Sequence, residues 1–284
     1  MFIQFDLYNK DNLFEQLAVR TEFEHITDGR VGAVVADFKD NFIPLVRTTT
    51  KYEKPTQKFT DLHYKLVERI KRFSAKPDLK LNNALIEIYD DNYRKMGFHS
   101  DQALDLEDDS YIAVYSCYKN PMKSVVNPRK LVVKKKVPKG ESSKCFKIDM
   151  HHDTVILFST KTNKEHLHKI VLEGNKCDGN KWLGMTFRLS KTFVQNIIIK
   201  EHEPLRSYSC ISTTNKGVFR GALYFTQATE KEACEFYKLR SKENKTVDFE
   251  YPLITYTISS SDLIPISNKY ENSSSHGCEC DDYY

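Results

Sequence analysis

The sequence has little of several features that define whole classes of protein. Glycine is scarce, with 10 residues in 284, which excludes a collagen-like chain. No apolar run approaches the roughly 18 residues that a membrane-spanning helix needs, so we expect no membrane partner. Lys and Arg (43) nearly balance Asp and Glu (39), and the resulting net charge of +4 does not by itself indicate a nucleic-acid-binding protein.

Paired cysteines and an export signal are also lacking. The seven cysteines are odd in number and scattered, which is typical of reduced thiols rather than of a disulfide framework. The first residues contain no basic stretch followed by an apolar run, so we expect an intracellular protein of the cytoplasm or nucleus. Only Cys278 and Cys280 lie close together, in an acidic tail where a frayed terminus is favoured over a metal site.

What is present indicates a folded, strand-rich chain. Hydrophobic residues make up 40% and aromatic residues 12% of the sequence, enough for a sizeable core. Apolar residues at helical spacing predict helices over residues 11–21 and 61–73, and the segment 31–46 is typical of a hairpin. Between residues 82 and 190 the period changes to two, which predicts strands over 84–89, 111–118, 130–137, 145–150, 154–159, 167–172 and 182–190. The fold class is therefore α+β, with helices packed on a β-sandwich or jelly roll.

The remainder of the chain is interpreted as an extension packed on this core. Residues 201–270 contain a predicted helix over 230–244, which begins with a capping box formed by Thr229 and Glu232. A strand is predicted over residues 251–258. Residues 271–284 are expected to be a disordered tail.

Metal-ligating residue types recur at two places in the strand-rich region. His99 and Asp101 are two residues apart, so on an extended chain both side chains point to the same side. On this motif alone a simple His–Asp hydrogen bond is favoured. His168 opens a later strand and supplies a third ligand, with His166 as the rival because it faces the same way. Two histidines and one carboxylate are the ligand set of non-haem Fe(II) oxygenases, whereas nothing completes a zinc site.

The strand over residues 182–190 adds a buried cation. Its alternation places Trp182, Thr186, Arg188 and Ser190 on one face and four apolar residues on the other. An arginine that points into a sandwich needs an anion. A structural salt bridge would satisfy it, and so would a dicarboxylate co-substrate.

These residues resemble a known family in their order along the chain. The sequence looks like the AlkB-like branch of the Fe(II)/2-oxoglutarate dioxygenases. The matching positions, in chain order, are Tyr89, residues 99–101, residues 163–168 and residues 186–188. The resemblance covers roughly residues 40–192. It implies a double-stranded β-helix within a dioxygenase domain over residues 1–200, with its core at about 82–192.

The resemblance also implies the ligands of the site. Fe(II) would be bound by His99, Asp101 and His168, and the co-substrate 2-oxoglutarate would contact Arg188, Tyr89 and Thr186. Two positions depart from the family pattern. Trp182 stands where the family usually has a second arginine, so Arg188 with Ser190 would take the distal carboxylate. Glu87 stands where the family tends to have asparagine, and it must be neutralised or face the substrate.

The implied reaction uses O₂ and 2-oxoglutarate to oxidise N-alkyl groups, with release of formaldehyde, succinate and CO₂. Nucleic acid (DNA or RNA) is the expected substrate for two reasons. Residues 110–140 contain eight basic and no acidic residues, among them the consecutive Lys134, Lys135 and Lys136, and such a basic patch attracts phosphates. Arg47, Thr48 and Tyr52 lie in a segment that resembles a substrate-recognition loop. The alternatives are a charged edge hairpin and a plain surface loop.

Two other functions are compatible with the same residues. One is a 2-oxoglutarate-dependent hydroxylase that acts on protein side chains, since one iron centre can serve many substrates. The other is a non-catalytic binding protein with a degenerate site. The chain is expected to be a monomer.

Overall fold

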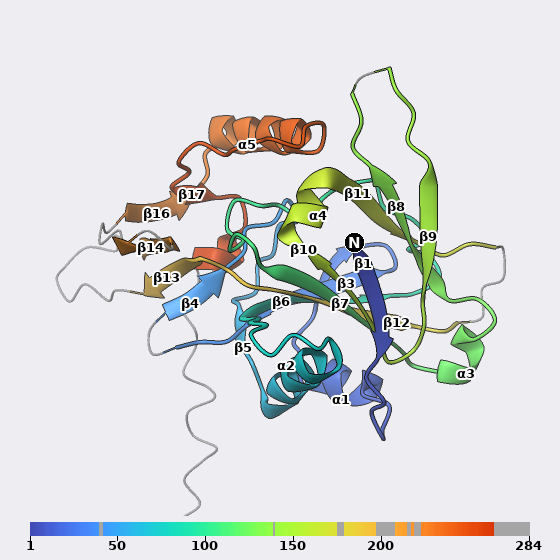
Figure 1. Ribbon diagram of the computed structural model, residues 1–284. Coiled ribbons are helices and arrows are strands. Elements are labelled where there is room, and N and C mark those ends of the chain that lie inside the picture. Colours follow the sequence, from blue (N-terminus) through green and yellow to red (C-terminus); the bar gives the residue numbers. More distant parts are fainter. Residues whose placement is uncertain are drawn as a thin grey trace, which may run out of the picture.

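The computed structural model describes residues 1–39, 42–138, 140–174, 179–196, 208–214, 217–218 and 223–263. They form a mixed α+β structure with mostly antiparallel sheets and few helices, compatible with a β-sandwich (Figure 1). The expected fold class is confirmed at this level. The predicted tail over 271–284 lies outside the described residues.

An eight-stranded sheet forms the centre of the molecule. Its strands run in the order β1-β10-β7-β12-β6-β3-β2, with β5 beside β3. The neighbours are antiparallel, except that β5 pairs with β3 in parallel. The bounds are β1 Phe2–Asp6, β2 Glu24–Thr27, β3 Arg30–Ala36, β5 Gln57–Lys58, β6 Asn83–Tyr89, β7 Tyr111–Tyr118, β10 Thr154–Ser159 and β12 Trp182–Arg188.

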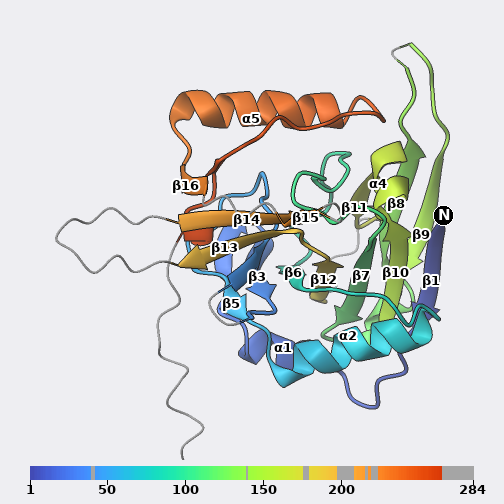
Figure 2. The ribbon, with the colours of Figure 1, turned by 60° about the vertical axis from the view of Figure 1, so that its left-hand side comes forward.

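Two helices cover one face of this sheet. α2 (Asp61–Phe73) has the predicted bounds, and its N-cap residue Thr60 forms a capping box with His63. α1 (Phe14–Val19) is shorter than the predicted helix over 11–21. Leu17 of α1 and Leu66 and Ile70 of α2 pack into one core cluster with the apolar residues of β6, β7 and β12. Figure 1 and Figure 2 both show the two helices side by side below the sheet.

A three-stranded sheet packs on the opposite face. Its order is β11-β8-β9, with β8 at Arg129–Lys135, β9 at Cys145–Met150 and β11 at His166–Val171. Leu131, Val133 and Ile170 of this sheet share a second core cluster with Ile112, Phe158 and Trp182 of the large sheet. Two short helices join the layers, α3 (Pro121–Ser124) and α4 (Thr160–Glu165). This face-to-face packing encloses the candidate site.

A third sheet contains β4 from the N-terminal part of the chain and strands from its C-terminal part. Its order is β17-β16-β14-β13-β4, with β15 beside β14. Its bounds are β4 Phe42–Leu45, β13 Thr192–Asn196, β14 Tyr208–Thr214, β15 Gly217–Val218, β16 Leu223–Gln227 and β17 Tyr256–Thr257. Helix α5 (Glu230–Glu243) has the predicted capping box of Thr229 and Glu232, and the turn η1 (Ser260–Leu263) follows β17.

Besides α1, two predicted elements differ in extent from the structure. The hairpin over 31–46 is limited to one bridge between Lys39 and Phe42, because β3 joins the large sheet and β4 pairs with β13. The strand predicted over 251–258 is limited to Tyr256–Thr257, because only these two residues pair with β16. Both segments are apolar, but their pairing partners lie elsewhere in the sequence. Local pattern cannot report such partners.

A candidate metal centre between the sheets

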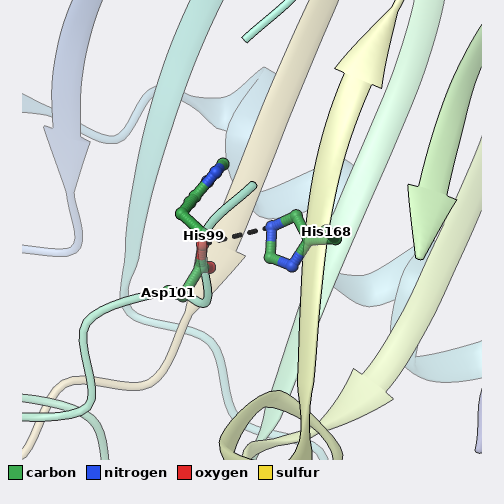
Figure 3. A group of neighbouring side chains, drawn as sticks. All are labelled: His99, Asp101 and His168. Carbon is green, nitrogen blue, oxygen red and sulfur yellow. Dashed lines mark ion pairs between the residues drawn. The ribbon is translucent and has the colours of Figure 1, made fainter. Parts of the chain in front are cut away.

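His99, Asp101 and His168 meet at one point between the two sheets (Figure 3). One ligand atom from each residue lies within 4.8 Å of the others. The His99 and His168 rings have centroids 4.7 Å apart, and His168 Nε2 lies 3.6 Å from Asp101 Oδ1. The rival His166 is not in this group: its Nδ1 lies 3.0 Å from the Thr162 carbonyl and its ring packs on Phe2. The structure therefore brings together the three predicted ligands.

Backbone pairing explains why distant segments meet here. The segment that follows β6 runs beside β11, where the N–H of His99 donates to the carbonyl of His168 at 3.0 Å. The N–H of His168 donates back to the carbonyl of His99 at 2.7 Å. An antiparallel bridge places both side chains on the same face. The carboxylate of Asp101 follows two residues later, on that face as well.

Asn163 of α4 holds the backbone of the acidic ligand. Its Oδ1 accepts from the N–H of Asp101 at 2.8 Å, and its Nδ2 donates to the Asp101 carbonyl at 2.7 Å. The amide of Asn163 is 1% exposed, so both hydrogen bonds are made away from water. This side chain was not predicted as a site residue. The motif order contained it, but a single asparagine before a strand has no distinctive signal.

The three ligands have the protonation states that a cation requires. Burial, followed by the charge of His99, lowers the pKa of His168 to about 3. Burial also lowers the pKa of His99, so both imidazoles are neutral at pH 7. Burial raises the pKa of Asp101, but Arg188 and the two histidines outweigh it and hold that pKa well below its usual range. Neutral imidazoles and an ionised carboxylate are the forms that ligate metals.

Arg188 lies beside the carboxylate, as its place on β12 predicts. Its Nε donates to Asp101 Oδ2 at 2.8 Å, and its Nη1 donates to the carbonyl of Thr186 at 3.4 Å. The guanidinium is 7% exposed. Its pairing with Asp101 matches the structural salt bridge that the sequence left open. The other alternative is a bound dicarboxylate. It would require N–H groups of the Arg188 guanidinium to donate to a carboxylate of that molecule as well as to Asp101.

Ser190 and Trp182 do not fit the expected co-substrate contacts. The hydroxyl of Ser190 lies within hydrogen-bond distance of three carbonyl oxygens, those of Leu45, Asp105 and Thr192, and its single proton is donated to one of them; β12 ends before this residue. The structure therefore does not pair Ser190 with Arg188, and their shared contact with a distal carboxylate stays a prediction. The indole of Trp182 lies over Gly184 and donates from Nε1 to Ser116 Oγ at 2.7 Å. It fills the interior where the family pattern has a second arginine.

Glu87 is neutralised, which was one of its two expected states. Arg30 donates from Nε to Glu87 Oε1 at 2.7 Å, and the hydroxyl of Tyr89 donates to the other carboxylate oxygen. Tyr52 adds a longer hydrogen bond to Oε1 at 3.4 Å. The hydroxyl of Tyr89 is thus engaged within the protein, although its ring packs on Trp182 in the sandwich interior. Arg30 was missed because its partner lies 57 residues away.

The predicted recognition segment is mainly structural. Arg47 is 3% exposed and pairs with Asp105, while its Nη1 donates to the carbonyls of Ile254 and Tyr256. Tyr52 is 1% exposed and cannot stack on a base at the surface. Thr48 Oγ1 donates to the nearby carbonyl of Thr50 at 2.7 Å. Both side chains predicted to contact a substrate, Arg47 and Tyr52, are thus buried against the protein itself, and the structure does not place them at a surface.

The three adjacent lysines separate in the structure. Lys136 is buried and donates from Nζ to the carbonyl of Glu243 at 2.7 Å, so it caps α5 rather than facing a substrate. Lys135 is exposed. Lys134 lies with its Nζ 4.4 Å from the ring centroid of Phe98, and Lys169 of β11 lies 4.5 Å from the same ring. Lys169 and Phe98 were not predicted, because the pairing of β8 with β11 brings Lys169 to Lys134 and the bridge between His99 and His168 brings Phe98 to both.

A comparison with protein-family models finds no match, and neither does a comparison with curated proteins. Among the residues that the structure describes, no helix is both long enough and apolar enough to cross a membrane.

Proposed function

We propose that this chain is an Fe(II)- and 2-oxoglutarate-dependent dioxygenase, similar to the AlkB-like branch, that oxidises N-alkyl groups on nucleic acid bases. The observation that carries the proposal is the meeting of His99, Asp101 and His168 within 4.8 Å. Two imidazoles and one carboxylate leave coordination positions open, which is the arrangement of non-haem Fe(II) oxygenases.

The order of the strands supports a double-stranded β-helix, or jelly roll, as the core. From β6 onward the chain moves between the large and the small sheet: β6 is in the large sheet, the bridge at His99 joins β11, and β7 is in the large sheet again. β8 and β9 lie in the small sheet, β10 in the large, β11 in the small and β12 in the large. Such alternation is what closes two sheets into a jelly roll.

The residues present fit a divalent metal. His99 and His168 are held as neutral imidazoles, and Asp101 is held as a carboxylate. When bound, Fe(II) would supply the oxidative chemistry by coupling O₂ to the conversion of 2-oxoglutarate to succinate and CO₂. Phe158, whose ring centroid lies 5.7 Å from that of His168, provides an apolar wall that limits the access of water.

For 2-oxoglutarate, the fit rests on Arg188. It is buried between the sheets next to Asp101, where one carboxylate of a co-substrate bound at the metal would also lie. A guanidinium recognises carboxylates through paired N–H groups, so Arg188 is the residue that we assign to the co-substrate. Thr186 lies on the same face of β12. Tyr89 contributes its ring to the wall of the site, and its hydroxyl stays on Glu87.

For the substrate, the support is a small cationic and aromatic surface. Phe98 directly precedes the ligand His99, and the ammonium groups of Lys134 and Lys169 lie over its ring. Phosphates attract such ammonium groups, and a flat ring can stack with a base. We therefore assign substrate binding to Phe98, Lys134 and Lys169, and no longer to Arg47 and Tyr52.

The metal and co-substrate are tested by an anaerobic titration of Fe(II) and 2-oxoglutarate into the protein, followed through the visible charge-transfer band of the complex. His168→Ala should abolish the band. His166→Ala is the matched control, because His166 lies two residues away on β11 and is outside the ligand group; it should keep the band. If the wild-type protein gives no band, the assignment fails.

The substrate class is tested under turnover conditions. Methylated single- and double-stranded DNA and RNA should release formaldehyde in step with succinate, whereas methylated peptides should not. Release from peptides alone would instead assign the chain as a protein hydroxylase. Succinate formation from neither class would support a non-catalytic binding protein.

A further inference from the structure

The C-terminal end of α5 contacts the residue between two of the candidate ligands. Ser100 lies between His99 and Asp101 and is 1% exposed. Its N–H and its hydroxyl both donate to Asn244 Oδ1, at 3.0 and 3.1 Å. Its carbonyl accepts from Arg240 Nη2 at 2.7 Å. All the hydrogen-bonding groups of Ser100 are therefore engaged by residues about 140 positions later in the chain.

The contacting groups are themselves fixed. Glu243 accepts from the N–H of Ala103 at 2.8 Å, and its other oxygen accepts from Arg240 and from the hydroxyl of Tyr251. Lys136 of the core caps the end of the helix through the carbonyl of Glu243. Figure 2 shows α5 running along the side of the molecule opposite to α1 and α2. The polar contacts thus extend from α5 to the segment of the candidate ligands and to Lys136, the residue that follows β8.

Energetics indicate a positional rather than a stabilising role. Arg240 and Glu243 are 7% and 5% exposed, and burying two charges costs free energy that their attraction only partly offsets. An apolar pair at these positions would hold the helix as well. What the polar set adds is direction, because hydrogen bonds fix the backbone of Ser100 at defined angles.

Three consecutive residues are thereby held by three separate elements. The backbone of His99 pairs with His168 of β11, Ser100 is held by α5, and the backbone of Asp101 is held by Asn163 of α4. Without these contacts, the connecting segment that contains His99 and Asp101 would be free to change its conformation. Metal ligands need support of this kind to keep their geometry.

We propose that Asn244 and Arg240 are positioning residues of the metal centre, so that the C-terminal extension completes the site. This inference rests on the proposed metal site. Asn244 acts through its single oxygen, which receives both donors of Ser100, and Arg240 acts through the Ser100 carbonyl.

The test is a titration of the full-length protein with Co(II), whose visible absorption reports its coordination. Asn244→Ala should weaken Co(II) binding by about tenfold and change the spectrum. Asn244→Asp keeps an acceptor oxygen in place and should restore both. Ser241→Ala is the matched control, because Ser241 is exposed on the same helical turn. Thermal unfolding of each metal-free variant separates a loss of fold from a loss of geometry.

The outcomes are distinguishable. Wild-type affinity and spectrum in Asn244→Ala would overturn the inference while leaving the metal site intact. Absence of Co(II) binding in the wild-type protein would overturn the metal site itself, and the inference with it. If Asn244→Ala does not fold, Ser100→Ala tests the same contact by removing only the hydroxyl donor. A loss of affinity in that variant supports the proposal, and an unchanged affinity opposes it.

Discussion

The two faces of β12 have opposite characters. On one face Leu183, Met185 and Phe187 are fully buried against the core that α1 and α2 cover. On the other face Trp182, Thr186 and Arg188 point toward the small sheet and the candidate ligands. One strand therefore serves as an apolar base on one side and as a wall of the site on the other.

The difference teaches which face contributes stability and which contributes specificity. Apolar burial is roughly proportional to area and has no direction, so the helix-covered face can be rigid without any particular partner. The site face contains a buried Arg188–Asp101 pair, whose two charges lose their hydration. A rigid apolar layer offsets that cost and holds the polar layer in position.

The largest effect is expected on the helix-covered face. Phe187→Ala should lower the free energy of unfolding by about 3–5 kcal/mol, because it leaves a cavity in the core. Co(II) affinity of the folded fraction should stay at the wild-type value. Denaturant unfolding measures the first quantity and a metal titration the second. Loss of both together would show that the two faces are not separable.

A smaller loss is expected from the site face. Arg188→Met removes one partner of a buried ion pair and should cost about 3 kcal/mol, because Asp101 is left uncompensated. A bound divalent cation compensates that carboxylate, so Co(II) should recover part of the loss. Unfolding curves with and without Co(II) test this. A cost that is the same in both conditions would mean that Asp101 does not contact the metal.

The pH dependence of stability probes α2. Burial lowers the pKa of His63 from 6.5 to about 4, and its Nδ1 accepts from the N–H of Thr60 in the capping box. The unfolded chain gains this proton below pH 6.5 and the folded chain does not, so the free energy of unfolding falls as the pH drops from 6.5 toward 4, by about 3 kcal/mol in total. His63→Gln keeps the cap and does not titrate, so it should flatten this part of the curve. An unchanged slope in the variant would contradict the assignment.

The smallest effect is expected at the outer surface of the small sheet. Lys169→Ala should weaken binding of a methylated oligonucleotide a few-fold and lower the salt dependence by about one phosphate contact. Lys147→Ala is the control on the same sheet, because Lys147 pairs with Glu173. Fluorescence anisotropy at several salt concentrations measures both. Equal effects in the two variants would indicate general charge attraction instead of a contact at Phe98.

Several features were predictable because their signal is local. Period-two alternation identified both faces of β12, and the capping residues Thr229 and Glu232 marked the start of α5. The candidate ligands His99 and Asp101 were visible as a two-residue spacing. In each case the information lies within one turn or one strand of the chain.

Other features were not predictable, because their partners are far away in the sequence. Arg47 lies in a segment whose composition is that of a recognition loop, but its side chain is buried. It donates to the carbonyls of Ile254 and Tyr256, which lie 207 and 209 residues later. The lysines at 134 and 136 look equivalent in sequence, yet one lies over Phe98 and the other caps α5. Which of two similar side chains faces outward depends on what packs against the strand.

By itself, the sequence determined the strand-rich α+β class, the positions of most elements and the set of residues from which a metal site could be built, since periodicity and ligand spacing are local properties. The tertiary structure alone decided that His168 rather than His166 joins the group, that Glu87 is neutralised by Arg30, and that α5 holds the ligand segment. Each of these depends on contacts between residues that are distant along the chain, and only the packing of the sheets brings them together.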